Sequence, residues 1–238
     1  MNQLERYRNM HLWMVIPFLI VFLGFARSYF FNLGNVSWPQ HLHGASATLW
    51  YVLLIVQPYL ITRRKDYISH KKLGLIGILI AGMVAGTAFN IIPGNLENVA
   101  KYTEADFFSP NFAYAATLLD LLMVSGFIVC VLIAMIKAKD LYQHTGWILA
   151  SAFIIIAAAS TRLYAVAAFM FTDNVTFKIA AVPAMTISVL ITAFYFYKFS
   201  SLKHPAFYVF LLANLPAFFV DTIGSNPAWR QLADSIFK

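Results

Sequence analysis

Residues 112–136, FAYAATLLDLLMVSGFIVCVLIAMI, are predominantly apolar and contain one charged side chain, Asp120. A helix needs about 20 predominantly apolar residues to cross the hydrocarbon core of a bilayer. A strand of a transmembrane β-barrel needs only about 10 residues, with apolar and polar side chains in alternation. This stretch is too long and too uniformly apolar for such a strand, so it predicts a transmembrane helix.

Further stretches of the same character occur on both sides, at 11–31, 43–61, 73–92, 146–171, 178–197 and 205–223. Hydrophobic residues make up 61% of the chain and charged residues 11%, roughly half the charged fraction of a typical soluble domain. The connections are too short to hold a soluble domain. The sequence therefore predicts an all-α, polytopic membrane bundle of about seven helices, with residues 1–238 as a single integral membrane domain.

The distribution of Lys and Arg predicts the orientation of the bundle. With the N-terminus inside, the inner segments hold most of the cations: Arg6, Arg8, Arg63, Arg64, Lys65, Lys71, Lys72, Lys137, Lys139, Lys198 and Lys203. The long outer loop at 93–111 is acidic. Cytoplasmic loops are enriched in Lys and Arg, so we expect an inner (cytoplasmic) membrane-type protein with its N-terminus inside and its C-terminus outside. The cations are spread over several loops, which indicates the lipid bilayer as partner and no nucleic acid.

Small residues suggest which helices are central. Gly82-x-x-x-Gly86 in the third span and the run 157–160 (Ala-Ala-Ala-Ser) in the fifth would let neighbouring helices approach closely. We therefore expect these two spans in the middle of the bundle and the sixth and seventh at its periphery. The single cysteine, Cys130, excludes an intramolecular disulfide and a CxxC motif.

Polar side chains inside the spans are the candidate functional residues, because ionisable groups in lipid are costly. His43, Trp50 and Gln57 are separated by sevens, which places them on one stripe of the second span. His144 and Arg162 are 18 residues apart, which is five helical turns, or about 27 Å along one face of the fifth span. Both helices thus carry a polar group near each end.

The inner group consists of Gln57, His70 and His144. Both histidines begin a span, where the helix dipole favours the neutral ring, and a neutral imidazole can ligate a metal or haem iron. Facing helices could then supply two axial ligands. In the alternative interpretation they are interfacial residues that cap helices or contact lipid headgroups, as we also expect of His11 and His204.

The outer group consists of His41, His43, Asn90, Asp120, Arg162 and Asp221. Asp120 and Arg162 lie at matching depth, which favours a buried ion pair. Alternatively, Arg162 holds an anionic group or a quinone oxygen. His41 and His43 point in different directions if that stretch is helical, so they cannot share one metal ion.

The succession His43-Gly44, Gln57, a basic loop, His70 leading to Gly74, His144-x-x-Trp147 and Arg162-Leu163 resembles the bacterial membrane protein family DUF2306. The resemblance covers roughly 41–165. It implies that His43, Gln57, His70, His144 and Arg162 act as one set, and it implies no particular activity. The family has more basic residues after the later histidine, where this chain has Thr145, Gly146 and Ala150.

These patterns favour a membrane redox protein that binds haem b, with His70 and His144 as axial ligands, or that is linked to quinone through His43 and Arg162. Three alternatives remain open: a proton-linked small-molecule transporter, a zinc-dependent membrane hydrolase, and a non-catalytic scaffold or assembly subunit. HExxH, GxSxG and phosphate-loop motifs are absent from the sequence, so the chemistry typical of those motifs is unsupported.

Overall fold

The computed structural model describes residues 3–97, 99–106, 108–172 and 177–237, and every regular element in them is helical. The α-helices are α1 (Met10–Trp13), α2 (Val15–Gly24), α3 (Trp38–Tyr59), α4 (Tyr67–Ile91), α5 (Gly94–Glu97), α6 (Pro110–Ile136), α7 (Leu141–Phe153), α8 (Ile156–Phe169), α9 (Phe177–Phe199), α10 (Pro205–Asn214), α11 (Val220–Gly224) and α12 (Pro227–Phe237). Short 3-10 helices lie at Gln3–Tyr7, Leu33–Asn35, Val99–Lys101 and Leu215–Phe219, and π-helical turns lie at Ala26–Phe30 and Leu60–Arg64.

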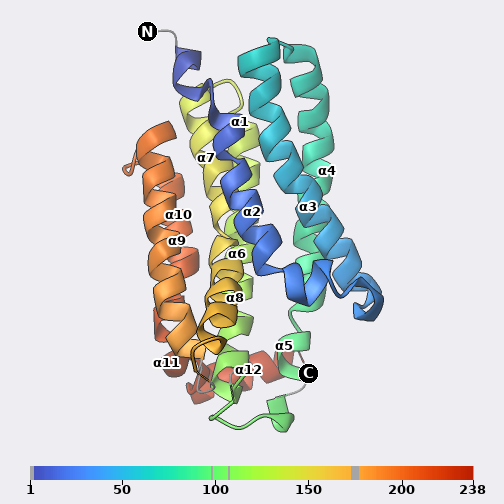
Figure 1. Cartoon of the computed structure of the whole chain (residues 1–238), viewed down its shortest axis with the longest axis vertical. Helices are drawn as coiled ribbons and strands as arrows, with labels where there is room; N and C mark the ends of the chain where they lie inside the picture. Colours follow the sequence, from blue (N-terminus) through green and yellow to red (C-terminus); the bar gives the residue numbers. More distant parts are fainter. Residues whose placement is uncertain (1–2, 98, 107, 173–176, 238) are drawn as a thin grey trace.

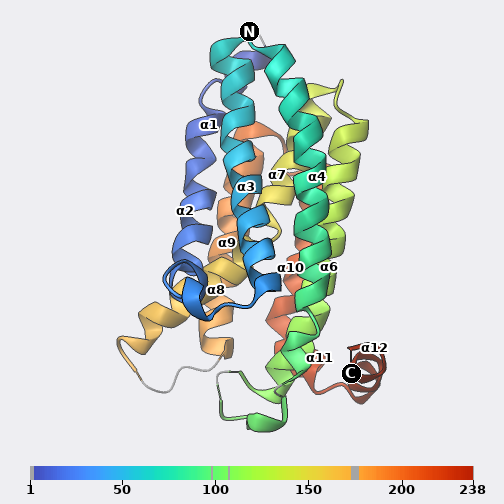
Figure 2. The ribbon, with the colours of Figure 1, turned by 90° about the vertical axis from the view of Figure 1, so that its right-hand side faces the viewer.

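Within the described residues, seven helical segments are long and apolar enough to cross a membrane: Leu4–Gly24, Trp38–Arg64, Tyr67–Lys101, Pro110–Ile136, Leu141–Phe169, Ile179–Phe199 and Pro205–Gly224. They run side by side along the long axis of the molecule (Figure 1). The N-terminus and the turn between α3 and α4 lie at one end, and α5, α12 and the C-terminus lie at the other (Figures 1 and 2). The all-helical, multi-pass architecture expected from the sequence is confirmed.

Side-chain caps define where the spans begin. The Asp66 carboxylate accepts a 2.9 Å hydrogen bond from the Ser69 backbone N–H at the start of α4. That bond holds the pKa of Asp66 below its usual range. Ser109 and Asp140 cap α6 and α7 in the same way. Because each cap satisfies an N–H group that the helix itself leaves free, the chain can turn within a few residues and re-enter the bundle.

The centre of the bundle differs in part from the expectation. Half of the most apolar window of the fifth span is buried, compared with 28% of that of the third. The third span is therefore not central, and the sixth and seventh spans, at 44% and 39%, are more buried than it is. The reason is that α4 packs against α3 and α6 with a side of the helix that does not carry Gly82 and Gly86. Around Gly82 and Gly86 there is open space.

The fifth span is interrupted near its middle, where α7 ends at Phe153 and α8 begins at Ile156. The hydroxyl of Tyr51 donates a 2.6 Å hydrogen bond to the carbonyl of Ala152, just before the interruption. Tyr51 is completely buried. Backbone polar groups at membrane depth require a protein partner because the hydrocarbon offers none. A side chain of α3 thus supplies that partner to the interrupted helix.

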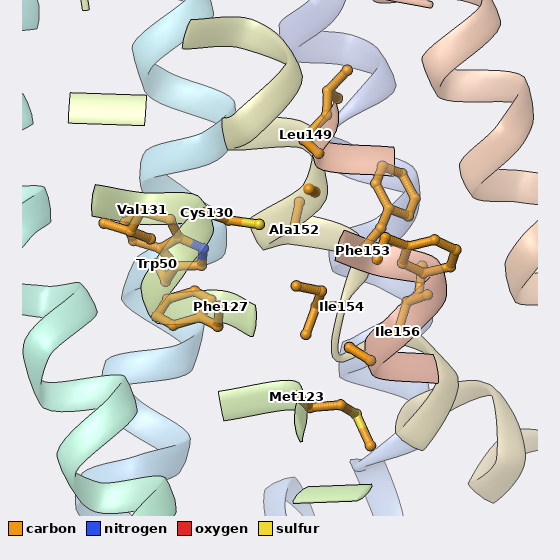
Figure 3. Close-up of a cluster of buried hydrophobic side chains, with 14 of the residues drawn as sticks. Trp50, Met123, Phe127, Cys130, Val131, Leu149, Ala152, Phe153, Ile154 and Ile156 are labelled. Carbon is orange, nitrogen blue, oxygen red and sulfur yellow. The ribbon is translucent and has the colours of Figure 1, made fainter. Parts of the chain in front are cut away.

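An apolar plug fills the middle of the bundle; we define it as Trp50, Phe127, Val131 and Ile154. These side chains, with Cys130, come together from α3, α6 and the α7–α8 junction (Figure 3). The Trp50 and Phe127 rings meet edge to face with centroids 5.3 Å apart. Since Trp50 lies midway between the ends of the polar stripe on α3, the plug separates the two polar groups.

The helix α12 lies across the end of the bundle (Figures 1 and 2) and was not expected from the sequence. The Trp229 indole donates to the Tyr114 carbonyl at 2.8 Å, and Arg230 donates to the Asn111 side-chain oxygen at 2.7 Å. Just before α12, Gly224 packs so closely on the Asn111 carbonyl that a Cβ would overlap it. The chain therefore leaves the seventh span at a fixed angle.

Candidate functional site

A cavity of about 340 Å³ opens between α2, α3, α4, α5, α6 and α8, on the α5 side of the plug. Its wall is mostly apolar, with residues such as Val21, Phe25 and Met123. Into this wall are set polar side chains, among them His43, Asn95, Asp120 and Arg162. The structure thus brings together three of the six residues of the outer polar group, His43, Asp120 and Arg162.

His43 is held in one tautomer by its neighbour on α4. Its Nδ1 lies 3.1 Å from the Thr87 hydroxyl oxygen, and that hydroxyl donates its own hydrogen to the Met83 carbonyl at 2.6 Å. The Thr87 oxygen can therefore only accept from His43. We assign the proton to Nδ1, so Nε2 carries a lone pair and can accept a hydrogen bond or a proton.

Asp120 is hydrogen-bonded to the segment at 93–111 rather than paired with an arginine. Its carboxylate accepts a 2.8 Å hydrogen bond from the Asn95 side-chain amide, and Asn95 belongs to the short helix α5. Leu96, the next residue, is buried against Tyr114 of α6 and Ala233 of α12. This part of the loop at 93–111 therefore closes one side of the cavity.

Arg162 is anchored without a carboxylate in direct contact. Its guanidinium donates to the Ala158 carbonyl of its own helix at 3.0 Å and lies over the Phe25 ring, 4.5 Å from the centroid. Among the described residues no ion pair joins it to Asp120, although the two charges attract each other across the cavity. The expected ion pair is wrong: Asn95 supplies the hydrogen bond to the Asp120 carboxylate, and the Arg162 guanidinium is held at the Ala158 carbonyl and the Phe25 ring instead. Arg162 keeps other N–H groups for a ligand, and its side chain remains accessible.

The inner group also comes together, through Gln57. With its amide oriented to satisfy both ends, the Gln57 NH2 donates to the His70 carbonyl and to His70 Nδ1, while its oxygen accepts from the Gly74 N–H at 2.9 Å. A backbone carbonyl can only accept and a backbone N–H can only donate, so these two groups fix the amide. His70 Nδ1 is therefore an acceptor, and its proton resides on Nε2.

His144 has the opposite tautomer. Its Nδ1 lies 2.8 Å from the Ala134 carbonyl, so this nitrogen carries the proton and Nε2 is free to accept. His70 and His144 are close enough to interact electrostatically. The three residues that were predicted to form the inner group, Gln57, His70 and His144, thus lie at one end of the bundle.

The other three predicted members of the outer group do not line the cavity. Asn90 and Asp221 were expected to be buried and are exposed on the surface of the bundle. Asn90 lies near the end of α4 on a side that the neighbouring helices leave uncovered, and Asp221 is in the first turn of α11. His41 packs edge to face on Tyr29, with ring centroids 5.8 Å apart, and does not join His43.

His204 was expected at an interface and is instead completely buried. It caps α10, its Nδ1 accepting from the Ala206 N–H at 3.1 Å. Tyr142 and Trp147 pack edge to face on its ring at 5.0 and 5.7 Å. Its Nε2 has no partner among the described residues, and burial lowers the pKa of His204. The following Pro205 is a sequence signal for a helix start, but no local pattern indicates the burial.

In the described part of the chain, no group of three or more His, Cys, Asp or Glu side chains is placed to hold a metal ion. Comparisons with protein-family models, with curated proteins and with solved structures gave no match.

Proposed function

We propose that this chain is a multi-pass protein of the bacterial inner membrane that binds a quinone in the cavity and takes part in its oxidation and reduction. In this proposal the N-terminus is cytoplasmic and the cavity lies in the outer half of the bilayer. The orientation rests on the cations: Arg6, Arg63, Arg64 and Lys65 all lie at the end that holds the N-terminus, as the positive-inside rule requires.

The observation that carries the proposal is the set of hydrogen-bond donors and acceptors in the cavity. His43 Nε2 offers an acceptor, the Arg162 guanidinium offers donors, and Asp120 offers a carboxylate oxygen. A quinone has two carbonyl oxygens that accept, and its reduced form has two hydroxyl groups that donate. Arg162 would hold an oxygen of the oxidised form, and His43 and Asp120 would receive the two hydrogens of the reduced form.

The size and the wall of the cavity suit the same ligand. Its volume of about 340 Å³ lies within the range of small-molecule sites, about 300–1,000 Å³. Phe25, Phe30 and Phe127 are among the lining residues, and aromatic rings stack favourably on a flat ring. Oxidation of a quinol releases two protons and two electrons. His43 and Asp120 would take the protons, and a separate membrane redox protein would take the electrons.

The residues of the inner group do not fit a second hypothesis, a haem b held between His70 and His144. His144 suits ligation, since a carbonyl holds its Nδ1 proton and leaves Nε2 free. His70 does not, because Gln57 engages its Nδ1 as an acceptor and keeps the proton on Nε2. The proposed reaction therefore involves no haem.

The test is quinone binding by the purified protein. A lipid extract of the protein as isolated should contain quinone, and a short-chain ubiquinone should bind saturably in detergent. A hydrogen bond to a charged group is worth about 1.5–3 kcal/mol, so Arg162→Gln should weaken binding about 10- to 150-fold. His43→Leu should weaken binding of the reduced form, a short-chain ubiquinol, about 2- to 12-fold, because a quinol hydroxyl loses a neutral hydrogen bond of about 0.5–1.5 kcal/mol to His43 Nε2.

Arg27→Gln is the matched control, because Arg27 is exposed and does not line the cavity; its affinity should equal that of the wild type. Absence of quinone from the extract together with no saturable binding would overturn the proposal. An absorption spectrum of the same sample, before and after dithionite, tests haem separately. A haem spectrum that is lost in both His70→Ala and His144→Ala would contradict the tautomer argument.

A further inference from the structure

The helix α12 has a single apolar face. At about 100° per residue, the side chains follow one another around the helix in the order Leu232, Ile236, Trp229, Ala233 and Phe237. Together they span an arc of about 140°. The remaining positions from Arg230 onward are polar, as in helices that lie at a membrane surface.

Among the described residues, the bundle covers one half of this arc. Ala233 is completely buried, and Trp229 and Phe237 pack with it against Tyr114 of α6. In the other half, Leu232 is 51% exposed and Ile236 is 58% exposed. The apolar face therefore continues beyond the area that the bundle covers.

The connection to the seventh span fixes the depth of α12. The last helix of that span ends at Gly224, and α12 begins at Pro227, so two residues join them. The Arg230 side chain donates back to the Gly224 carbonyl at 2.6 Å. Figure 2 shows α12 outside the outline of the bundle, beside the end of α11. A helix attached in this way lies where the spans leave the hydrocarbon, at the level of the lipid headgroups.

We infer that α12 is an interfacial helix that inserts Leu232 and Ile236 into the boundary between headgroups and acyl chains of the leaflet at this end of the bundle. Its charged residues are engaged by the protein: Arg230 binds Asn111, and Asp234 accepts from the Tyr114 hydroxyl at 2.8 Å. The contact with lipid is therefore apolar and requires no anionic headgroup. This inference does not depend on the quinone proposal.

Site-directed spin labelling of the full chain in nanodiscs of neutral phosphatidylcholine tests the inference. The labels are placed one at a time by Leu232→Cys and Ile236→Cys, with Gln231→Cys and Ser235→Cys as matched controls on the exposed polar side of the same helix. All four are made in Cys130→Ala, which removes the buried native cysteine. Collision with oxygen, which concentrates in lipid, is compared with collision with a water-soluble nickel chelate.

We expect oxygen accessibility to exceed nickel accessibility several-fold at 232 and 236 and the ratio to be reversed at 231 and 235. Equal nickel accessibility at all four positions would place the helix in water and overturn the inference. Exclusion of both reagents at 232 and 236 would also overturn it, because a protein surface, such as a second copy of the chain, would then cover the face.

Discussion

Replacing Gly146 by alanine tests how closely α7 packs on the buried ring of His204. A Cβ at position 146 would lie 2.5 Å from His204 Nε2 and Cε1. The ring cannot move aside, since it is completely buried and caps α10 through Nδ1. Overpacking of this kind costs about 1–3 kcal/mol, whereas alanine in place of glycine stabilises a helix by about 1 kcal/mol. The net loss in the free energy of unfolding should be about 0–2 kcal/mol, with a central value of about 1 kcal/mol.

A double-mutant cycle with His204→Asn isolates that contact. Asparagine keeps a side chain that can cap α10 and removes most of the ring, so Gly146→Ala should become neutral or stabilising by up to about 1 kcal/mol in this background. The coupling should therefore be about 2 kcal/mol, measured by equilibrium unfolding in detergent and followed by circular dichroism. If Gly146→Ala costs the same in both backgrounds, the close contact between the glycine and the ring does not exist.

The remaining predictions concern other buried contacts. Tyr51→Phe removes the buried hydrogen bond at the interrupted helix and should lower the free energy of unfolding by about 1–3 kcal/mol. The control Tyr197→Phe, at a side chain that is 75% exposed, should have no measurable effect. Equal losses in the two variants would refute the stabilising role of the Tyr51 hydrogen bond. Burial lowers the pKa of His204 in the folded protein. As the pH falls, the unfolded chain therefore binds a proton at this side chain before the folded chain does. Stability should decline as the pH falls below about 6.5, the ordinary histidine value, and a thermal-unfolding series should give a flatter profile for His204→Asn. Gly224→Ala would force a Cβ into the Asn111 carbonyl and should detach α12, as limited proteolysis of the C-terminal residues would detect; an unchanged digestion pattern would contradict the contact.

The spans could be predicted because each is a long apolar run, and length alone separates such runs from soluble helices. The stripe on α3 was also predictable from helical periodicity: His43 lines the cavity, and Gln57 contacts His70. Which side of a helix faces its neighbours was harder to predict from the sequence. Gly82 and Gly86 form a typical packing motif, and yet the space beside them is open, because small residues permit close approach without specifying a partner.

The site itself depends on contacts between residues far apart in the chain. Asp120 and Arg162 were matched by depth, but the partner of Asp120 is Asn95, from a loop whose path no local pattern indicates. The burial of His204 has the same origin, since it requires Tyr142 and Trp147 of α7 to surround a turn more than fifty positions later in the sequence.

The apolar plug has an electrical consequence. Moving one elementary charge through a membrane potential of 100 mV changes its energy by about 2.3 kcal/mol. Trp50, Phe127 and Ile154 belong to an apolar layer in the middle of the bundle. Such a layer has a low dielectric constant, so most of the voltage should fall across it. His43, Asp120 and Arg162 all lie on one side of it. In the proposed reaction, a proton that leaves a quinol for His43 and then escapes on the same side would cross almost none of the voltage, so this proton transfer should be insensitive to the membrane potential.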